Sequence, residues 1–176
     1  MEKSKYSMIR AVCRIGLMAA VIECAKIVLM ALPNIEVATL CIAMFSFVFG
    51  WQGVVSTVIF VIIESLLWGF GTWVISYIIY WPLVAVAFLL LGRVRFKRAF
   101  VKIIFATVLA VVLTVFFGVL TSFVDVGLFS GSYDRLFERF AIYYARGVVF
   151  YVLQIATNAV VFPILFHPLT EKLKKL

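Results

Sequence analysis

The chain has 176 residues, of which 66% are hydrophobic and only 14% are charged, whereas soluble domains average about 45–50% apolar and about 25% charged residues. A soluble fold of this length cannot bury so much apolar surface, so lipid must serve as much of its solvent. The net charge of +8 comes largely from Lys and Arg residues that flank apolar runs, which argues against nucleic-acid binding. The apolar runs lack the alternation of a membrane β-barrel, so the sequence predicts an all-α, polytopic membrane protein.

Apolar runs separated by Gly, Pro and charged residues predict a single domain, 1–176, with six membrane spans. In chain order, the spans cover about residues 11–32, 37–49, 54–68, 72–91, 101–124 and 140–166. The second and third runs are short for independent spans. They form either one hairpin that reaches the far face or two short helices shielded by the others. Glycine-containing breaks at 50–53 and 69–71 separate them from each other and from the fourth span.

Basic residues are concentrated before the first span, in the loop after the fourth span and at the C-terminus. The central loop alone holds Arg93, Arg95, Lys97, Arg98 and Lys102. Cytoplasmic loops of membrane proteins carry such an excess of Lys and Arg. Six spans with a cytoplasmic N-terminus also bring this loop and the C-terminus to the cytoplasm. The charge pattern therefore predicts a six-helix bundle with both termini cytoplasmic.

The first span carries two separate signals. Gly16, Ala20 and Cys24 recur every four residues and form a flat face that lets another helix approach closely, within this chain or on a partner. Glu23 and Lys26 lie three residues apart on one helical face. They form either a mutually neutralising pair or a site from which Lys26 reaches towards the membrane surface.

Acidic and aromatic residues surround the turn between the third and fourth spans. Glu64 and Trp68 share a helical face, and Glu64 is either a hydrated carboxylate near the interface or an acceptor for a ligand. Trp73, Tyr77 and Tyr80 form a stripe on the fourth span. Such a stripe belongs to an interfacial aromatic belt or, because Tyr80 lies deeper than a belt requires, stacks on a planar ligand.

The sixth span is the most polar. Its polar residues fall near one line along the helix, which should face protein or water rather than lipid: Arg139, Tyr143, Arg146, Gln154 and Asn158. The planar guanidinium of Arg146 suits a carboxylate or phosphate of a ligand, and it can equally form a structural bridge to Glu64.

These groups converge on the outer half of the bilayer and predict a binding pocket there, suited to a ring-bearing molecule with an acidic group. The candidate members are Asn34, Glu36, Glu64, Trp68, Trp73, Tyr77, Tyr80, Tyr143, Arg146 and Gln154. The sequence has no catalytic motif and no metal-binding pair of histidines, and its one histidine, His167, is expected at the interface. We therefore expect no enzyme activity, no metal and no cofactor.

The combined pattern resembles the substrate-binding S component of energy-coupling factor (ECF) vitamin transporters. The shared features are a small basic six-span chain, the small-residue face on the first span and three segments that look similar: 32–36 (Leu-Pro-Asn-Ile-Glu), 68–73 (Trp-Gly-Phe-Gly-Thr-Trp) and 158–163. The resemblance covers almost the whole chain. The family's small-residue motif usually has alanines, whereas Gly16 and Cys24 replace two of them here.

The resemblance implies a multi-pass protein of the prokaryotic plasma membrane that captures a vitamin or similar micronutrient at its outer face. Such a protein docks through Gly16, Ala20 and Cys24 onto a membrane coupling subunit, and two cytoplasmic ATPase subunits drive release by toppling it in the membrane. The main alternative is a stand-alone carrier or channel, which predicts a continuous polar path across the bilayer. An intramembrane enzyme is a third hypothesis, disfavoured because no catalytic group is recognisable.

Overall fold

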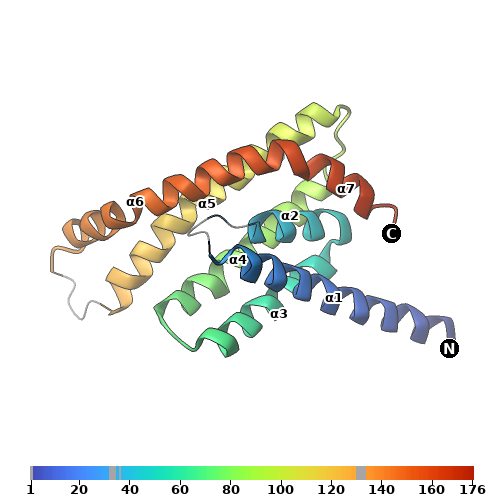
Figure 1. Cartoon of the computed structure of the whole chain (residues 1–176), viewed down its shortest axis with the longest axis horizontal. Coiled ribbons are helices and arrows are strands. Elements are labelled where there is room, and N and C mark those ends of the chain that lie inside the picture. The colour runs from blue at the N-terminus through green and yellow to red at the C-terminus, as the bar shows by residue number, and fades with distance from the viewer. Residues whose placement is uncertain (1, 32–34, 36, 130–133) are drawn as a thin grey trace.

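The computed structural model describes residues 2–31, 35, 37–129 and 134–176, and these residues form helices without any strand (Figure 1). Each predicted span falls on a helix, so the all-α prediction is confirmed. In chain order the helices are α1 (Glu2–Leu29), α2 (Ala38–Phe49), α3 (Trp51–Trp68), α4 (Thr72–Gly92), α5 (Ala99–Phe129), α6 (Leu136–Val161), the π-helical turn η1 (Phe162–Phe166) and α7 (His167–Leu173).

The break between α2 and α3 is shorter than the sequence predicted. Only Gly50 lies outside the two helices, with a positive φ of 59° that favours glycine. Gly53, expected in the turn, is instead part of α3. A Cβ on Gly53 would lie 2.4 Å from the backbone nitrogen of Ser46, so the absence of a side chain lets the backbones of α2 and α3 touch. The two short helices therefore form a tight hairpin.

The sixth predicted span continues beyond residue 166, because α6, η1 and α7 follow one another without a break (Figure 1). Proline has no N–H group to donate to the preceding turn of an α-helix. Pro163 lies inside η1 and Pro168 lies at the start of α7, so the wider π-helical turn occurs where the normal hydrogen bonds are interrupted.

Helix α2 lies at the centre of the bundle. All its residues from 38 to 46 are buried, and it packs against α1, α3, α4 and α7. This central position explains how a helix of 12 residues remains stable in an apolar protein: its neighbours shield it. Helices α5 and α6 form a long antiparallel pair, and the part of this pair nearest the α5–α6 connection extends away from the other helices on the left of Figure 1.

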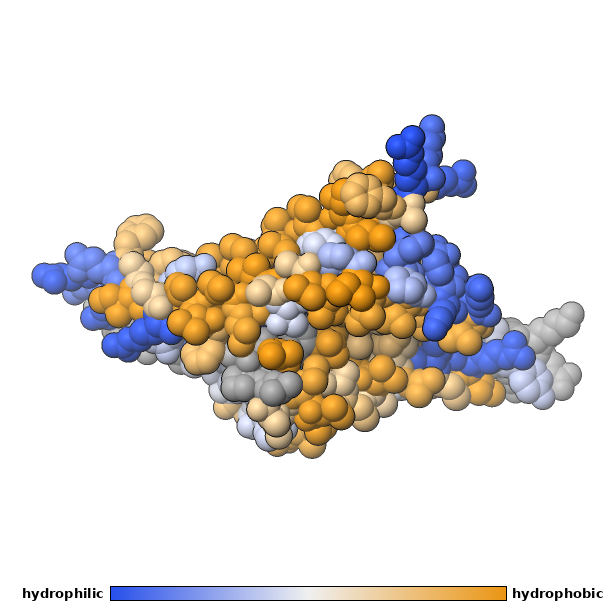
Figure 2. All heavy atoms as spheres, turned by 45° about the horizontal axis from the view of Figure 1, so that its top comes forward, coloured by the Kyte–Doolittle hydropathy of each residue, from blue (hydrophilic) through white to orange (hydrophobic). Residues whose placement is uncertain are grey.

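The surface has the pattern expected for a protein in lipid. Figure 2 shows a broad apolar surface across the middle of the molecule and hydrophilic residues gathered towards both ends of its longest axis. Within the described residues, four helical segments are long and apolar enough to cross a bilayer, namely Trp51–Trp68, Thr72–Gly92, Ala99–Leu128 and Leu136–Leu173, while α2 is apolar but shorter. The chain is thus a helical membrane protein.

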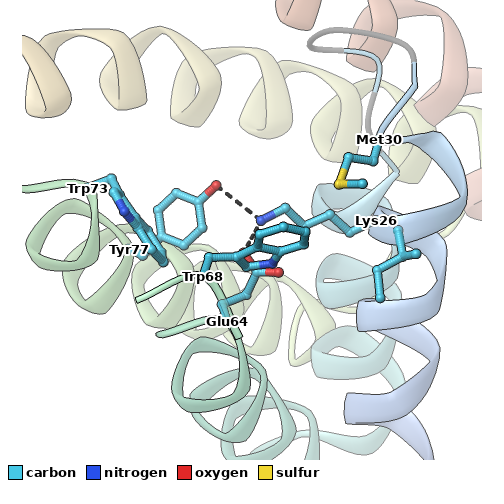
Figure 3. Close-up of a pocket in the computed structure, with 7 residues that line it drawn as sticks. Lys26, Met30, Glu64, Trp68, Trp73 and Tyr77 are labelled. Carbon is cyan, nitrogen blue, oxygen red and sulfur yellow. Dashed lines mark hydrogen bonds and ion pairs between the residues drawn. The ribbon is translucent and has the colours of Figure 1, made fainter. Parts of the chain in front are cut away.

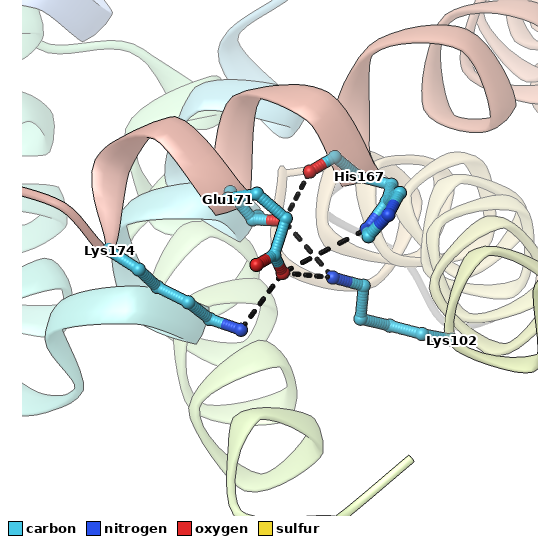
Figure 4. A network of polar contacts seen from close by, with 5 residues as sticks. Lys102, His167, Glu171 and Lys174 are labelled. Carbon is cyan, nitrogen blue, oxygen red and sulfur yellow. Dashed lines mark hydrogen bonds and ion pairs between the residues drawn. The ribbon is translucent and has the colours of Figure 1, made fainter. Parts of the chain in front are cut away.

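The basic segments lie together at one end. The N-terminus, the C-terminus and the α4–α5 loop are all on the right of Figure 1. A polar network joins α5 to α7 there (Figure 4): the Lys102 ammonium donates to Glu171 Oε1 at 2.8 Å, and Lys174 Nζ lies 3.0 Å from the same oxygen. This end is called the basic end below.

Candidate functional site

A pocket of about 220 Å³ lies between the C-terminal end of α1, the C-terminal end of α3 and the N-terminal end of α4. Because α4 runs from this pocket to the loop at the basic end, the pocket lies towards the opposite side of the bundle. We call it the aromatic pocket. It is lined by Lys26, Ile27, Met30, Glu64, Trp68, Trp73 and Tyr77 (Figure 3).

The α3–α4 turn brings four of these side chains together. Gly69 ends α3 with a φ of 80°, a conformation that favours glycine. A Cβ on Gly71 would lie 2.8 Å from the indole of Trp73, so glycine there leaves room for this ring to fold back over the turn. The segment 69–71 therefore reverses the chain within three residues and places Trp68 and Trp73 on the same pocket.

A partly buried ion pair forms the floor of the pocket. The Lys26 ammonium pairs with Glu64 Oε2 and lies 3.5 Å from the Tyr77 hydroxyl, as the dashed lines of Figure 3 mark. The Glu64 side chain is 1% exposed, and its other oxygen, Oε1, has no hydrogen-bond partner within the described part of the chain. An ion pair in apolar surroundings loses hydration that it recovers only when every polar atom is satisfied. This pair is only partly satisfied.

Glu23 adds a second carboxylate beneath the pair. It lies three residues before Lys26 on α1, is 7% exposed and is close enough to Glu64 for the two carboxyl groups to interact. The sequence predicted that Glu23 would neutralise Lys26 or that Lys26 would reach the surface. In the structure the ion pair of Lys26 is with Glu64 on α3, and Glu23 keeps an electrostatic attraction to Lys26. Apart from its contact with Glu64, neither oxygen of Glu23 has a hydrogen-bond partner among the described residues.

Aromatic rings form the walls above the ion pair. The Trp73 and Tyr77 rings meet edge to face, with centroids 5.0 Å apart, and the Lys26 ammonium lies 5.0 Å from the centroid of the Tyr77 ring. Trp68 stands on the α3 side and is half exposed. Tyr80, expected on the same stripe, is fully buried and packs on Trp81 and Phe117, so it belongs to the core and not to the pocket lining.

The sixth helix does not supply the residues that the sequence placed in the pocket. Tyr143 and Arg146 are exposed on α6, which packs mainly along α5 and η1. The suggested bridge from Arg146 to Glu64 is absent, since Glu64 is paired with Lys26. Gln154 is buried one turn before Asn158, whose amide donates to Thr114 Oγ1 at 2.9 Å, so this part of the polar line faces α5. Asn34 and Glu36 lie outside the described residues.

Three lining residues were missing from the predicted pocket: Lys26, Ile27 and Met30. A signal for Lys26 was present, because Lys26 and Glu64 are opposite charges near the outer ends of two predicted spans. Opposite charges at one depth in an apolar medium are expected to pair. The apolar residues Ile27 and Met30 gave no such signal, since nothing distinguishes them from lipid-facing residues.

The small-residue face of α1 points away from the rest of the chain. Ala20 and Cys24 are exposed, and a Cβ on Gly16 would meet no atom within 4 Å. This face is therefore not used for packing within the described part of the protein. It stays available to lipid or to another helix.

Comparisons with protein families, with characterised proteins and with solved structures gave no match to this chain. Among the described residues, no group of three or more His, Cys, Asp or Glu side chains is placed to hold a metal ion. Function must therefore be inferred from the aromatic pocket, from the distribution of charge and from the resemblance to S components.

Proposed function

We propose that this chain is the membrane-embedded substrate-binding subunit of an ECF-type importer, which captures a ring-bearing micronutrient in the aromatic pocket. The observation that carries the proposal is the pocket itself. Three helix ends surround a partly satisfied, partly buried ion pair with Trp68, Trp73 and Tyr77. Small-molecule sites combine apolar and aromatic walls with a few orienting polar groups in this way.

The proposed topology has six spans with both termini in the cytoplasm. The clustering of Lys and Arg at the basic end supports this orientation, because cytoplasmic segments carry such an excess. The aromatic pocket then opens towards the outside, where a scarce nutrient is met. Single-cysteine labelling tests the orientation after Cys13, Cys24 and Cys41 are replaced by alanine. An impermeant reagent should label Glu138→Cys in intact cells and miss Arg95→Cys, whereas labelling of Arg95→Cys would overturn the orientation.

The proposed partners are a membrane coupling subunit and two cytoplasmic ATPase subunits. The exposed face at Gly16, Ala20 and Cys24 supports a helix–helix contact, because small residues let two backbones approach closely. Ala20→Leu should weaken association and transport while ligand binding by the isolated chain survives. Ala156→Leu, the same change at an exposed position of α6, is the matched control and should leave association intact.

Purification from the native membrane tests the whole proposal. We expect an ATPase and a second membrane subunit to co-purify with the chain, and mass spectrometry of the denatured sample to release one small ring-bearing molecule. A chain that transports alone in liposomes would instead establish the stand-alone carrier. Recovery of neither partners nor a bound small molecule would contradict the proposal.

A further inference from the structure

Two carboxyl groups and one ammonium meet at the floor of the aromatic pocket. Glu64 lines the pocket, and Glu23, which is buried and is not part of the lining, hydrogen-bonds to Glu64. Lys26 is the basic group that pairs with Glu64. Apart from the contact between the two carboxyl groups, both oxygens of Glu23 and Oε1 of Glu64 have no hydrogen-bond partner in the described part of the chain. Two acidic groups thus face one ammonium in an apolar environment.

Within the described part of the chain, no second basic residue lines the aromatic pocket. In the sequence, residues 32–36, which follow α1, include no Lys or Arg. Arg146, the basic residue that the sequence suggested, is exposed on α6. A buried charge without a partner is costly, so a site of this kind favours an incoming group of opposite sign.

The aromatic walls of the pocket also favour a positively charged ligand. Aromatic rings attract cations through the negative potential of their faces. The Lys26 ammonium already lies 5.0 Å from the ring centroid of Tyr77 and 5.9 Å from that of Phe60. Trp68 and Trp73, which stand above the ion pair, present two further ring surfaces to anything that enters.

From these observations we infer that the ligand of the aromatic pocket is a small ring-bearing organic cation. Its positively charged nitrogen binds Glu64 Oε1 and is attracted by Glu23, while its ring packs against Trp68 and Trp73. This inference rests on the proposed capture function and names the substrate class of that site. It replaces the acidic ligand expected from the sequence, because that expectation depended on Arg146.

A set of three matched probes tests the sign of the charge. The three probes share a phenyl ring and differ in charge. Benzylamine is positive, benzyl alcohol is neutral and benzoate is negative. Titration into the full chain in detergent should show benzylamine binding more tightly than benzyl alcohol by a factor of about ten or more, as a charge-assisted hydrogen bond provides. Benzoate should bind least. Equal binding of benzylamine and benzyl alcohol would overturn the inference. The inference would also be overturned if sodium chloride raised the melting temperature of the chain as much as benzylamine does at the same concentration.

Glu23→Gln separates a binding role from a structural one. This change keeps the shape of the side chain and leaves the Lys26–Glu64 pair intact. It should reduce the preference for benzylamine to about threefold or less and raise the melting temperature, because it removes a buried charge without a counter-charge. Glu138→Gln on the exposed start of α6 is the matched control and should change neither property. A lower melting temperature with unchanged probe preference would show that Glu23 is structural and would overturn its role.

The inference and the proposed function fail in different ways. If purification releases a neutral or acidic molecule together with the ATPase partners, the capture function stands and the cationic substrate is wrong. If benzylamine is preferred but no ATPase subunit associates, the substrate class stands and the importer is wrong. If no molecule is released and no probe binds, both are wrong.

Discussion

Two lysine–glutamate clusters lie towards opposite ends of this protein and differ in what surrounds them. In the aromatic pocket, Lys26 pairs with Glu64, which is buried, and a second buried carboxylate, Glu23, lies beside it. At the basic end, Lys102 pairs with Glu171, whose side chain is 45% exposed. There the carboxylate is shared by Lys102 and Lys174, and the surrounding loop is basic.

The two clusters differ in whether their carboxylates have hydrogen-bond partners. Glu171 accepts from two lysines, and its exposed side can be hydrated, so this carboxylate is satisfied (Figure 4). Its role is to fasten α7 to α5. In the aromatic pocket, three buried oxygens of Glu23 and Glu64 have no partner in the described part of the chain apart from the contact between the two carboxyl groups. Buried polar groups are normally satisfied, which agrees with the ligand proposed for this pocket.

The largest expected difference between the clusters appears when each lysine is replaced by methionine. Lys26→Met leaves Glu64 and Glu23 buried together without a cation, and removal of one partner of a buried pair costs about 3–5 kcal/mol. Lys102→Met leaves Glu171 with Lys174 and with water, so the cost should be about 1 kcal/mol. Unfolding midpoints of the two variants in the same detergent measure the difference.

The double variant Lys26→Met with Glu64→Gln provides the control for this prediction. It removes both members of the pair, so much of the lost stability should return. Equal destabilisation by Lys26→Met and Lys102→Met would show that the two clusters do not differ in the way proposed.

The next largest effect concerns the tryptophan side chains that line the aromatic pocket. Trp73→Ala removes a ring that lines the pocket and should weaken benzylamine binding by about tenfold, through lost ring contact and cation–π attraction. Trp51→Ala removes an exposed tryptophan outside the pocket and should leave the affinity unchanged. The Kd of each variant measures the effect, and a similar loss in both would indicate a general effect of tryptophan removal.

The sequence alone predicted the helices and four of the seven residues that line the aromatic pocket. Long apolar runs between Gly, Pro and charged residues placed every span on a helix, because a chain in lipid must satisfy its backbone within helices. Glu64, Trp68, Trp73 and Tyr77 were identified correctly as neighbours. They lie within one hairpin, where the short turn alone fixes which faces meet.

The other residues could not be assigned correctly from the sequence, because their place depends on how helices that are distant in the sequence pack together. The polar line on α6 was visible in the sequence, but a helical periodicity identifies a face and not the helix that it contacts. Arg146 lies on α6, which packs mainly along α5 and η1. Tyr80 was assigned to the ligand from its spacing, yet Trp81 and Phe117 enclose it, and this enclosure arises only when α5 packs against α4.

A smaller effect is expected when the acidic member of the basic end is neutralised. Glu171→Gln keeps a polar acceptor for Lys102, and Thr170 Oγ1 remains 3.4 Å from the lysine ammonium. We expect a loss of about 1 kcal/mol or less, decreasing as salt is added, because Glu171 is 45% exposed and salt screens exposed charges. Thermal unfolding at low and high ionic strength measures this loss, and a large, salt-independent loss would mean that the buried Lys102 ammonium depends on the charge of Glu171.

The smallest effect is expected at Arg146, the residue that the sequence suggested most strongly. Its side chain is exposed and Glu64 already has Lys26 as its counter-ion, so Arg146→Ala removes no contact that the structure assigns to the pocket. Substitutions at such surface positions usually change stability by about 0.5 kcal/mol or less. The melting temperature and the benzylamine affinity of Arg146→Ala should therefore both match the unmodified protein. A loss of affinity in a stably folded Arg146→Ala would mean that the α5–α6 pair closes over the aromatic pocket when ligand binds, and that the guanidinium then completes the site.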